Sequence, residues 1–441
     1  MNKRLLLLGC LVLIIIGNIK AQNPIIRDQF SADPSARAFE GRIYLYPSHD
    51  IPAPADYPRK DWFCMADYHV FSSDDLIHWK DHGVIFSQDN VSWVKPKSYG
   101  MLAPDCIFKN GKYYFYFPAT PNNMKDGTIG VAVSDHPSGP FSPETMPIKG
   151  TMGIDPCPFI DKDGQAYLYY AAGNIYVAKL KDDMTELASS PQVVQNLPKG
   201  FKEGPFFFER NGYYYLTYPL VIDKTETLAY SMGKSPMGPF EYKGLIMDES
   251  STGCWTNHHS VVEYKGQWYL FYHNNYYSPK FDKNRSVCAD SLFFNADGTI
   301  RKVIPTFRGV GVTSASDTIH IDRYSKIGKN ASITFLNDAN TFEGWKTCFK
   351  SGNAWIQYNT VDFGNKEPHA ITARVSSQTD GVLQVHVDSL NGPAIAQINV
   401  TPNNGWTLIK SPLLKYHYGI HNLFVVMTKG NNIDVNWLIF K

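Results

Sequence analysis

Acidic side chains recur at similar distances ahead of five glycines in this 441-residue chain. Four acids and one histidine stand 6 to 9 residues before these glycines; the five are Asp33, Asp105, Asp155, Glu203 and His258. Carboxyl groups that lie close together push their pKa values apart, because ionising one disfavours ionising the next. Glycoside hydrolysis needs such a split: one carboxyl must be protonated to supply the leaving oxygen, and another must be ionised to activate water.

The five glycines belong to an internal repeat of one or two polar residues, Gly and an aromatic-rich segment. Its copies are residues 38–46, 108–116, 161–169, 209–217 and 263–271. Each copy predicts a hairpin with Gly in the turn, and consecutive glycines are 48 to 70 residues apart. Repeats of about 50 residues with four short strands are typical of a β-propeller. We therefore expect five blades, whose first strands bring the five polar residues together at the central channel.

The composition agrees with an all-β protein. Aromatic residues make up 14% of the chain, and such residues favour strands. The 42 basic side chains nearly balance the 41 acidic ones, so the basic surface that nucleic acid or an anionic membrane requires is not expected. The predicted fold is a five-bladed β-propeller over residues 23–322 followed by a jelly-roll-like β-sandwich over residues 330–441.

The N-terminus has the pattern of a secretory signal. Lys3 and Arg4 precede the apolar run 5–16, and the small residue Ala21 is suitable for cleavage before Gln22. The run is too short for a confident membrane span, and no other segment is apolar enough. We expect a secreted or periplasmic protein with residues 1–21 removed; a lipoprotein anchored at Cys10 is the alternative. Six further cysteines show no dense disulfide framework, and buried free thiols are expected for most of them.

The ordered set of motifs resembles glycoside hydrolase family 43, a family of five-bladed propellers. The matching segments are 23–24 with 32–35, 154–156 with 161–164, and 202–205. The resemblance implies inverting hydrolysis with Asp33 as general base and Glu203 as general acid. It also implies that Asp155 orients the acid and tunes its pKa. Asp105 resembles a structural position of the family.

The same resemblance suggests contacts around the reacting sugar. Arg285, ahead of the segment 293–298, matches an arginine that contacts the sugar. His258 stands where the family places a channel histidine near calcium or another cation. A lone imidazole is a weak calcium ligand, so water would supply most of the ligands. No cofactor is expected for the chemistry. Trp255 and Trp93 are candidates for a sugar-stacking platform.

The C-terminal region predicts a separate module of short alternating strands. Segments 354–364, 388–392, 404–406, 418–423 and 435–440 resemble a family 6 carbohydrate-binding module. Two departures from the pattern of this module bear on whether the domain binds sugar. The acidic calcium-binding opening is not recognisable before Trp345, and Asp434 is ambiguous as the usual Asn ahead of the last strand. Trp406 is either a sugar-stacking aromatic or a core residue, and the module either binds sugar or only braces the propeller.

These features predict an inverting glycosidase that removes α-L-arabinofuranosyl or β-D-xylosyl residues from plant arabinoxylan or arabinan. A polysaccharide or oligosaccharide is the expected partner. An endo-arabinanase on the same fold and a non-catalytic sugar-binding propeller are the alternatives. A retaining fructan-active propeller would place Cys after the acid, whereas Gly204 follows Glu203 here.

Overall fold

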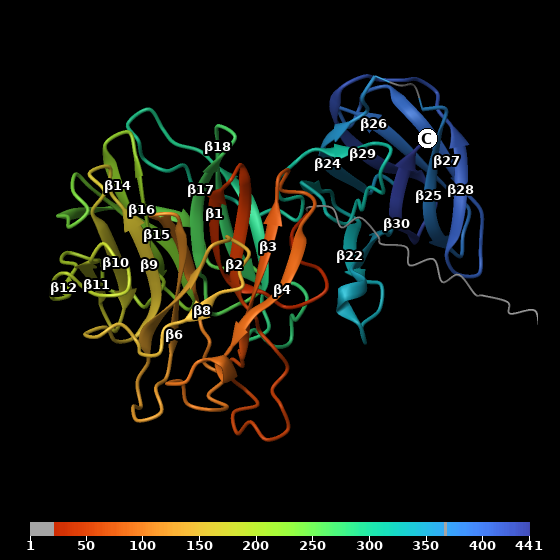
Figure 1. Ribbon diagram of the computed structural model, residues 1–441. Coiled ribbons are helices and arrows are strands. Elements are labelled where there is room, and N and C mark those ends of the chain that lie inside the picture. The colour runs from red at the N-terminus through yellow and green to blue at the C-terminus, as the bar shows by residue number, and fades with distance from the viewer. Residues whose placement is uncertain (1–21, 366–367) are drawn as a thin grey trace, which may run out of the picture.

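The computed structural model describes residues 22–365 and 368–441, and these residues are almost entirely β (Figure 1). Helical structure in this part of the chain is limited to two 3-10 turns, η1 (Gln88–Asn90) and η2 (Thr341–Glu343). The predicted signal segment, residues 1–21, and Cys10 lie outside the described residues. The described residues contain no helix with the length and apolarity that crossing a bilayer requires.

The first part of the chain folds into five antiparallel sheets, which confirms the five predicted blades. Blade 1 contains β1 (Ala32–Phe39), β2 (Arg42–Ser48), β3 (Asp67–Ser73) and β4 (Lys80–Ser87). Blade 2 contains β5 (Asp105–Lys109), β6 (Lys112–Ala119), β7 (Thr128–Ser134) and β8 (Ser142–Pro143). Blade 3 contains β9 (Ile154–Ile160), β10 (Ala166–Ala171), β11 (Ile175–Lys179) and β12 (Gln192–Val193). Blade 4 contains β13 (Phe206–Arg210), β14 (Tyr213–Val221), β15 (Glu226–Gly233) and β16 (Phe240–Met247). Blade 5 contains β17 (His259–Tyr264), β18 (Gln267–Asn274) and β19 (Ser286–Leu292).

The first strands of the blades form a closed ring, in which β1, β5, β9, β13 and β17 each contact the next and β17 returns to β1. The segment ahead of β1 closes the ring from outside. The Ile25 N–H donates to the Val287 carbonyl, and the Ser31 N–H donates to the Arg285 carbonyl, each at 2.9 Å. The segment ahead of β1 thus pairs with the last blade and covers part of the edge of β19.

The tyrosines of the repeat join neighbouring blades. Tyr46 in blade 1 donates its hydroxyl to the Pro137 carbonyl at 2.6 Å, and Tyr116 in blade 2 donates to the Met184 carbonyl at 2.7 Å. Tyr169 in blade 3 makes the equivalent bond to Pro236. Each ring is fully buried between blades while its hydroxyl still has a partner. The repeated aromatic position therefore serves blade-to-blade packing.

The C-terminal domain is a sandwich of two sheets. One sheet contains β20 (Thr313–Ser314), β21 (Lys326–Ile327), β24 (Trp355–Asp362), β26 (Gly381–Val387), β27 (Ala394–Val400) and β29 (Ile420–Lys429). The other contains β22 (Ala331–Phe335), β23 (Trp345–Phe349), β25 (Ala370–Ser377), β28 (Thr407–Pro412) and β30 (Ile433–Phe440). The structure differs from the predicted boundary at residue 322. β20 pairs with β24, and Ile319 and Ile321 are buried in the sandwich core, because their apolar side chains face its interior.

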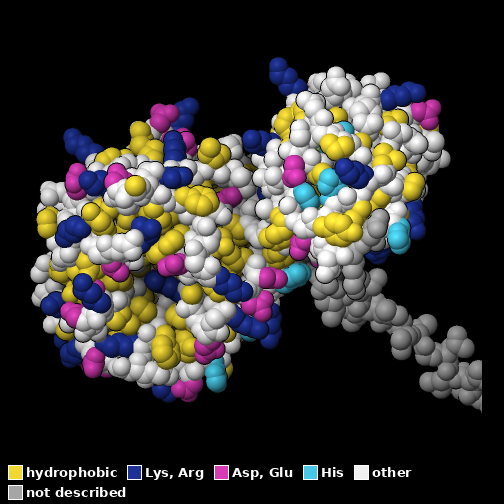
Figure 2. Space-filling view, turned by 90° about the horizontal axis from the view of Figure 1, so that it is seen from above, with side chains coloured by type: hydrophobic (Ala, Val, Ile, Leu, Met, Phe, Trp, Pro, Cys, Tyr) yellow, Lys and Arg dark blue, Asp and Glu magenta, His cyan; other side chains and the backbone are white. Residues whose placement is uncertain are grey.

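The sandwich lies beside the propeller and contacts it through buried cations and aromatic rings (Figures 1 and 2). Arg308 donates to the Asn359 carbonyl at 2.8 Å and to the Thr360 hydroxyl at 2.7 Å. Tyr277 of the propeller stacks on Trp345 of the sandwich with ring centroids 4.8 Å apart. The face in Figure 2 carries charges of both signs without one dominant patch. The six cysteines in the described part of the chain are free thiols, five of them buried.

Candidate active site

A cavity of about 190 Å³ lies where the first strands of the blades begin. Four of the five predicted residues line it: Asp33, Asp155, Glu203 and His258. Larger surface hollows of about 350 to 500 Å³ lie elsewhere, but the carboxyl groups that line them are exposed or half-exposed. In the described part of the chain, the smaller cavity brings together the buried carboxyl groups of Asp33 and Asp155 from different blades with the half-buried Glu203, and this combination favours acid–base chemistry.

Asp33 reaches the cavity from a β-bulge in β1. The register between β1 and β2 shifts by one residue between Ala32 and Ser35, and Asp33 has a left-handed φ of 45°. Pro34 follows and has no N–H for the ladder, which suits an interrupted strand. A bulge of this kind redirects a side chain, and backbone strain of this kind is often found at functional sites.

Four groups hold the Asp33 carboxylate. Ser48 Oγ donates to it at 2.7 Å, and the two terminal nitrogens of Arg285 donate at 2.7 and 3.1 Å. The Nδ1 atoms of His273 and His258 lie 3.4 and 3.8 Å from its Oδ1. Burial would raise the pKa of Asp33, but the charge of Arg285 opposes it most strongly and, with the Ser48 bond, lowers this pKa to about 2. Asp33 is therefore ionised at neutral pH, as a general base must be.

Asp155 occupies an equivalent bulge in blade 3. One extra residue stands in β9 between Ile154 and Cys157, and Asp155 has a φ of 59° ahead of Pro156. Its Oδ2 accepts a 2.8 Å bond from the N–H of Gly204, the residue after Glu203. Asp155 thus holds the backbone that carries Glu203. This contact supports the predicted orienting role.

Gly204 packs closely against Pro219 and His258. Its φ is +64°, and a Cβ at this position would lie 2.9 Å from the Pro219 ring and 3.2 Å from His258 Nδ1. Any larger residue would therefore displace the histidine or the backbone that follows Glu203. Both steric and conformational reasons therefore favour glycine directly after Glu203.

The carboxyl groups of Glu203 and Asp155 favour protonation. Burial and the negative charge of Asp33 raise the pKa of Glu203 to about 7, against the opposing charges of Arg285 and Lys202. Burial and the charges of Glu203 and Asp33 raise the pKa of Asp155 well above its usual range. Because Asp33 has the opposite shift, the cavity holds one ionised carboxylate and at least one carboxyl that carries a proton near pH 7. This is the pair of states that an acid and a base require.

Arg285 lines the cavity, but its closest partners are carboxylates. Besides Asp33 it binds Asp50, with its Nε 2.9 Å from Oδ2 and its Nη2 2.9 Å from Oδ1, and the Phe63 ring lies 4.6 Å from its Cζ. Asp50 is fully buried, follows β2 and was not predicted. The arginine is therefore fixed between two acids. The predicted sugar contact of Arg285 stays a prediction, and the geometry gives it a second role in keeping Asp33 ionised.

The two histidines near Asp33 are neutral at pH 7. Burial lowers the pKa of His258, and burial with the Arg285 charge lowers that of His273 to about 3. His273 Nδ1 accepts the Asp33 backbone N–H at 3.0 Å. In the described residues, His258 belongs to no group of three His, Cys, Asp or Glu side chains close enough to share an ion. The side chains around His258 therefore do not form a protein-built metal site, and a cation there stays a prediction.

Asp105 lies outside the cavity lining, although it begins the inner strand of blade 2. Arg37 Nε donates to its Oδ1 at 2.9 Å, and Arg37 Nη2 and Ser35 also bind it. The pair joins blade 1 to blade 2. These contacts agree with the structural role that the sequence favours for Asp105.

Among the described residues, one tryptophan lines the cavity, and it is neither of the two that the sequence suggests. Trp62, 42% exposed, lines the cavity with Phe63, and both come from the segment between β2 and β3. Trp255 is 40% exposed but is not part of the lining, so its sugar contact stays a prediction. Trp93 is buried against Phe117 in the propeller core, which removes it from the candidate platforms.

Glu226, at the start of β15, is a buried carboxyl that sequence reasoning missed. Its Oε2 accepts the Asn257 N–H at 2.8 Å, next to His258. Burial and the charge of Glu203 raise the pKa of Glu226 to about 8. No repeat motif marks this position. Its place at the start of β15, two residues ahead of the apolar pair 228–229, was the one available signal.

The comparisons with known proteins agree with this geometry. The family model described as glycosyl hydrolases family 43 matches residues 21–300. The chain belongs to glycosyl hydrolase family 43. The model of the family 6 carbohydrate binding module matches residues 326–441. The chain is thus a glycosidase with a C-terminal module of this type.

Three relatives place the chain within the family. Over 63% of its length it is 38% identical to xylosidase/arabinosidase 43A of Humicola insolens, of which 98% is covered. A solved β-xylosidase/α-arabinofuranosidase from a compost metagenome, in complex with xylotriose, is 36% identical with a TM-score of 0.58; the match covers 64% of this chain and 97% of that one. The Bacillus subtilis arabinoxylan arabinofuranohydrolase structure is 26% identical with a TM-score of 0.56, and its match covers 95% and 97% of the two chains.

Proposed function

We propose that this glycosidase removes terminal α-L-arabinofuranosyl or β-D-xylosyl residues from arabinoxylan or arabinan with inversion of the anomeric carbon. The observation that carries the proposal is the split between two carboxyls in one cavity. Asp33 has a pKa of about 2, and Glu203 has a pKa of about 7. A general base and a general acid require these opposite states.

The proposed reaction uses three side chains. Glu203 gives its proton to the glycosidic oxygen as the bond from the anomeric carbon to that oxygen breaks. Asp33 takes a proton from a water molecule that attacks the same carbon from the opposite face. Asp155 acts through the Gly204 N–H, which keeps Glu203 directed at the leaving oxygen.

Two observations support the sugar class and the exo mode. The relatives named above carry names that specify xylosidase, arabinosidase or arabinofuranohydrolase activity. The cavity of about 190 Å³ is smaller than the 300–1,000 Å³ typical of sites for drug-sized ligands, which favours one sugar ring over an extended chain.

Parallel assays with aryl α-L-arabinofuranoside and aryl β-D-xyloside test the proposal. Proton NMR of the first-formed sugar should show the inverted anomer from at least one of them. Release of the retained anomer would contradict the assignment of Asp33. With arabinan as the substrate instead, release of longer fragments without monosaccharide would favour endo action.

The Glu203→Gln variant separates an enzyme from a binding protein. It should lose hydrolysis of unactivated glycosides by about 10²- to 10⁴-fold and keep its affinity for the sugar. Unchanged hydrolysis would contradict Glu203 as the acid. We also propose that the protein acts outside the cytoplasm, as the pattern of residues 1–21 suggests; cell fractionation tests this.

A further inference from the structure

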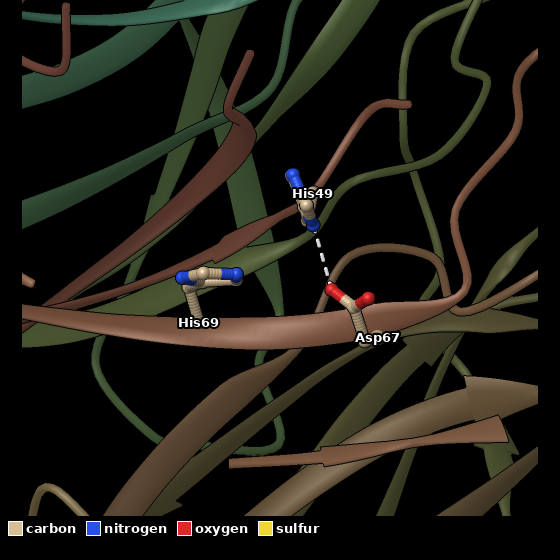
Figure 3. Close-up of side chains that lie close together, drawn as sticks. All are labelled: His49, Asp67 and His69. Carbon is tan, nitrogen blue, oxygen red and sulfur yellow. Dashed lines mark hydrogen bonds and ion pairs between the residues drawn. The ribbon is translucent and has the colours of Figure 1, made fainter. Parts of the chain in front are cut away.

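A group of metal-ligating side chains lies on blade 1, apart from the active-site cavity. It consists of His49, directly after β2, with Asp67 and His69 on β3. Each residue offers one ligand atom, and these atoms lie within 4.8 Å of one another. None of the three lines the cavity. Figure 3 shows the His69 ring over β3 beside the hydrogen-bonded pair of His49 and Asp67.

The backbone brings the three side chains together. Asp67 and His69 are two residues apart on one strand, so they point to the same face. His49 continues the neighbouring strand, and its Nδ1 lies 2.6 Å from Asp67 Oδ1. The His49 and His69 ring centroids are 4.7 Å apart. All three side chains are 14 to 20% exposed, so an ion from solution can reach them while their positions remain constrained.

A second carboxylate orients His69. Asp81 on β4 lies 3.1 Å from His69 Nδ1 through each of its oxygens. Asp81 is itself held by the Gly83 N–H at 2.7 Å and by Gln29 at 3.0 Å. This leaves the Nε2 of His69 as its free ligand atom. Metal-binding histidines commonly have such a carboxylate on the other ring nitrogen.

We propose that His49, Asp67 and His69 bind a divalent transition metal of the Zn²⁺ type. Two imidazole nitrogens and one carboxylate oxygen suit Zn²⁺, whereas Ca²⁺ requires six to eight oxygens. Tetrahedral Zn²⁺ with bonds of about 2.0 Å separates its ligand atoms by about 3.3 Å. The observed separations, from 2.6 Å to at most 4.8 Å, span this value, so small side-chain rotations complete the site. Water supplies the fourth ligand.

The ion would connect two strands next to the base. His49 lies between Ser48, which binds Asp33, and Asp50, which binds Arg285. Joining His49 to β3 therefore immobilises the segment that holds both groups. The site is distinct from the predicted cation near His258, and its existence does not depend on the proposed glycosidase activity.

Calorimetric titration of the chelator-treated full chain with ZnCl₂ tests the site. One Zn²⁺ per chain should bind, and the unfolding temperature should rise with it. His69→Ala and His49→Ala should each remove this binding, and Asp67→Asn should weaken it at least tenfold. His69→Gln serves as a second variant if the alanine variant unfolds. Co²⁺ in place of Zn²⁺ should give the visible spectrum of a four-coordinate site.

His78→Ala is the matched control, because His78 pairs with Asp75 at 2.7 Å on the same blade without a third ligand. It should bind Zn²⁺ as the unmodified chain does, and so should His258→Ala and His421→Ala. The proposal is overturned if the chain binds no Zn²⁺. It is equally overturned if His69→Ala and His69→Gln, both folded, bind normally, or if His258→Ala or His421→Ala removes the binding.

Discussion

The first aspartates of blades 1 and 3 differ from that of blade 2 in backbone conformation and in side-chain contacts. Asp33 and Asp155 each precede a proline, have positive φ and stand in a bulge of one extra residue, and both side chains line the cavity. Asp105 follows its proline and begins a regular ladder opposite Tyr116, and its carboxylate binds Arg37 instead. A proline after the aspartate interrupts the ladder and turns the side chain out of the strand register. An aspartate near the start of the first strand therefore lines the cavity or joins two blades, depending on whether a proline follows or precedes it.

Among the variants that test this comparison, Asp33→Asn should cause the largest loss of kcat. It removes the ionised base and the main partner of Arg285, so kcat on unactivated glycosides should fall about 10³-fold or more. Initial-rate assays against the unmodified chain measure this. A variant with most of its activity left would show that another group activates water.

The pH dependence of kcat/KM should report the titration of Glu203, the proposed general acid. Glu203 must be protonated and has a pKa of about 7, so kcat/KM should be intact below this pH and fall about tenfold per unit above it. Asp33, with a pKa of about 2, should impose no loss on the acidic side above about pH 3. Aryl substrates with good leaving groups need no proton and serve as the control, because their basic limb should flatten. The same limb in both substrates would contradict Glu203 as the acid.

Asp155→Asn should have an intermediate effect. The amide oxygen can still accept the Gly204 N–H, but the titratable carboxyl beside Glu203 is lost, and kcat should fall about 10- to 100-fold. The loss should be greater for substrates that need a proton on the leaving group, since Asp155 acts through Glu203. An equal loss for both substrate types would assign Asp155 a merely structural role.

Asp105→Asn should affect stability rather than catalysis. It leaves the largely buried Arg37 without its charge partner, a change that costs about 3–5 kcal/mol in buried pairs. Denaturant unfolding should show this loss, while kcat of the folded variant stays within about threefold of the unmodified chain. A loss of kcat as large as that of Asp155→Asn would end the distinction between the two aspartates.

Glu226→Gln should have the smallest effect. With a pKa of about 8 the carboxyl is mostly neutral at pH 7, and an amide can still accept the Asn257 N–H. We expect kcat/KM within about twofold. Glu226→Ala, which removes the acceptor, is the paired variant and should lower both activity and unfolding temperature. A large loss in the glutamine variant would place Glu226 in the proton-transfer machinery.

The repeat made the propeller predictable. Gly at a hairpin turn, an alternating aromatic strand and an acid ahead of them are local features that neighbouring residues determine. The end of the propeller was less predictable. Residues 313–321 carry no repeat signal, and their apolar side chains join the sandwich because that core surrounds them.

The partners of the acids were not predictable from order along the chain. Asp50 and Arg285 are 235 residues apart, and they meet because the N-terminal segment pairs with β19 and closes the ring. Trp62 lines the cavity and Trp255 does not, because the course of two loops decides this and no periodic pattern governs a loop.

Local sequence patterns were enough to predict the fold class, the blade positions of Asp33, Asp155, Glu203 and His258, and the place of Asp105 as a fifth equivalent residue. These depend on local periodicity and turn chemistry, which a linear chain displays. Which acid is ionised depends on the tertiary structure, since Arg285 and two imidazoles reach Asp33 from blade 5 and Ser48 reaches it from β2. The tertiary structure also brought His49 to Asp67 and His69. A pKa depends on every charge within a few ångströms, and those neighbours are set by packing across the whole ring.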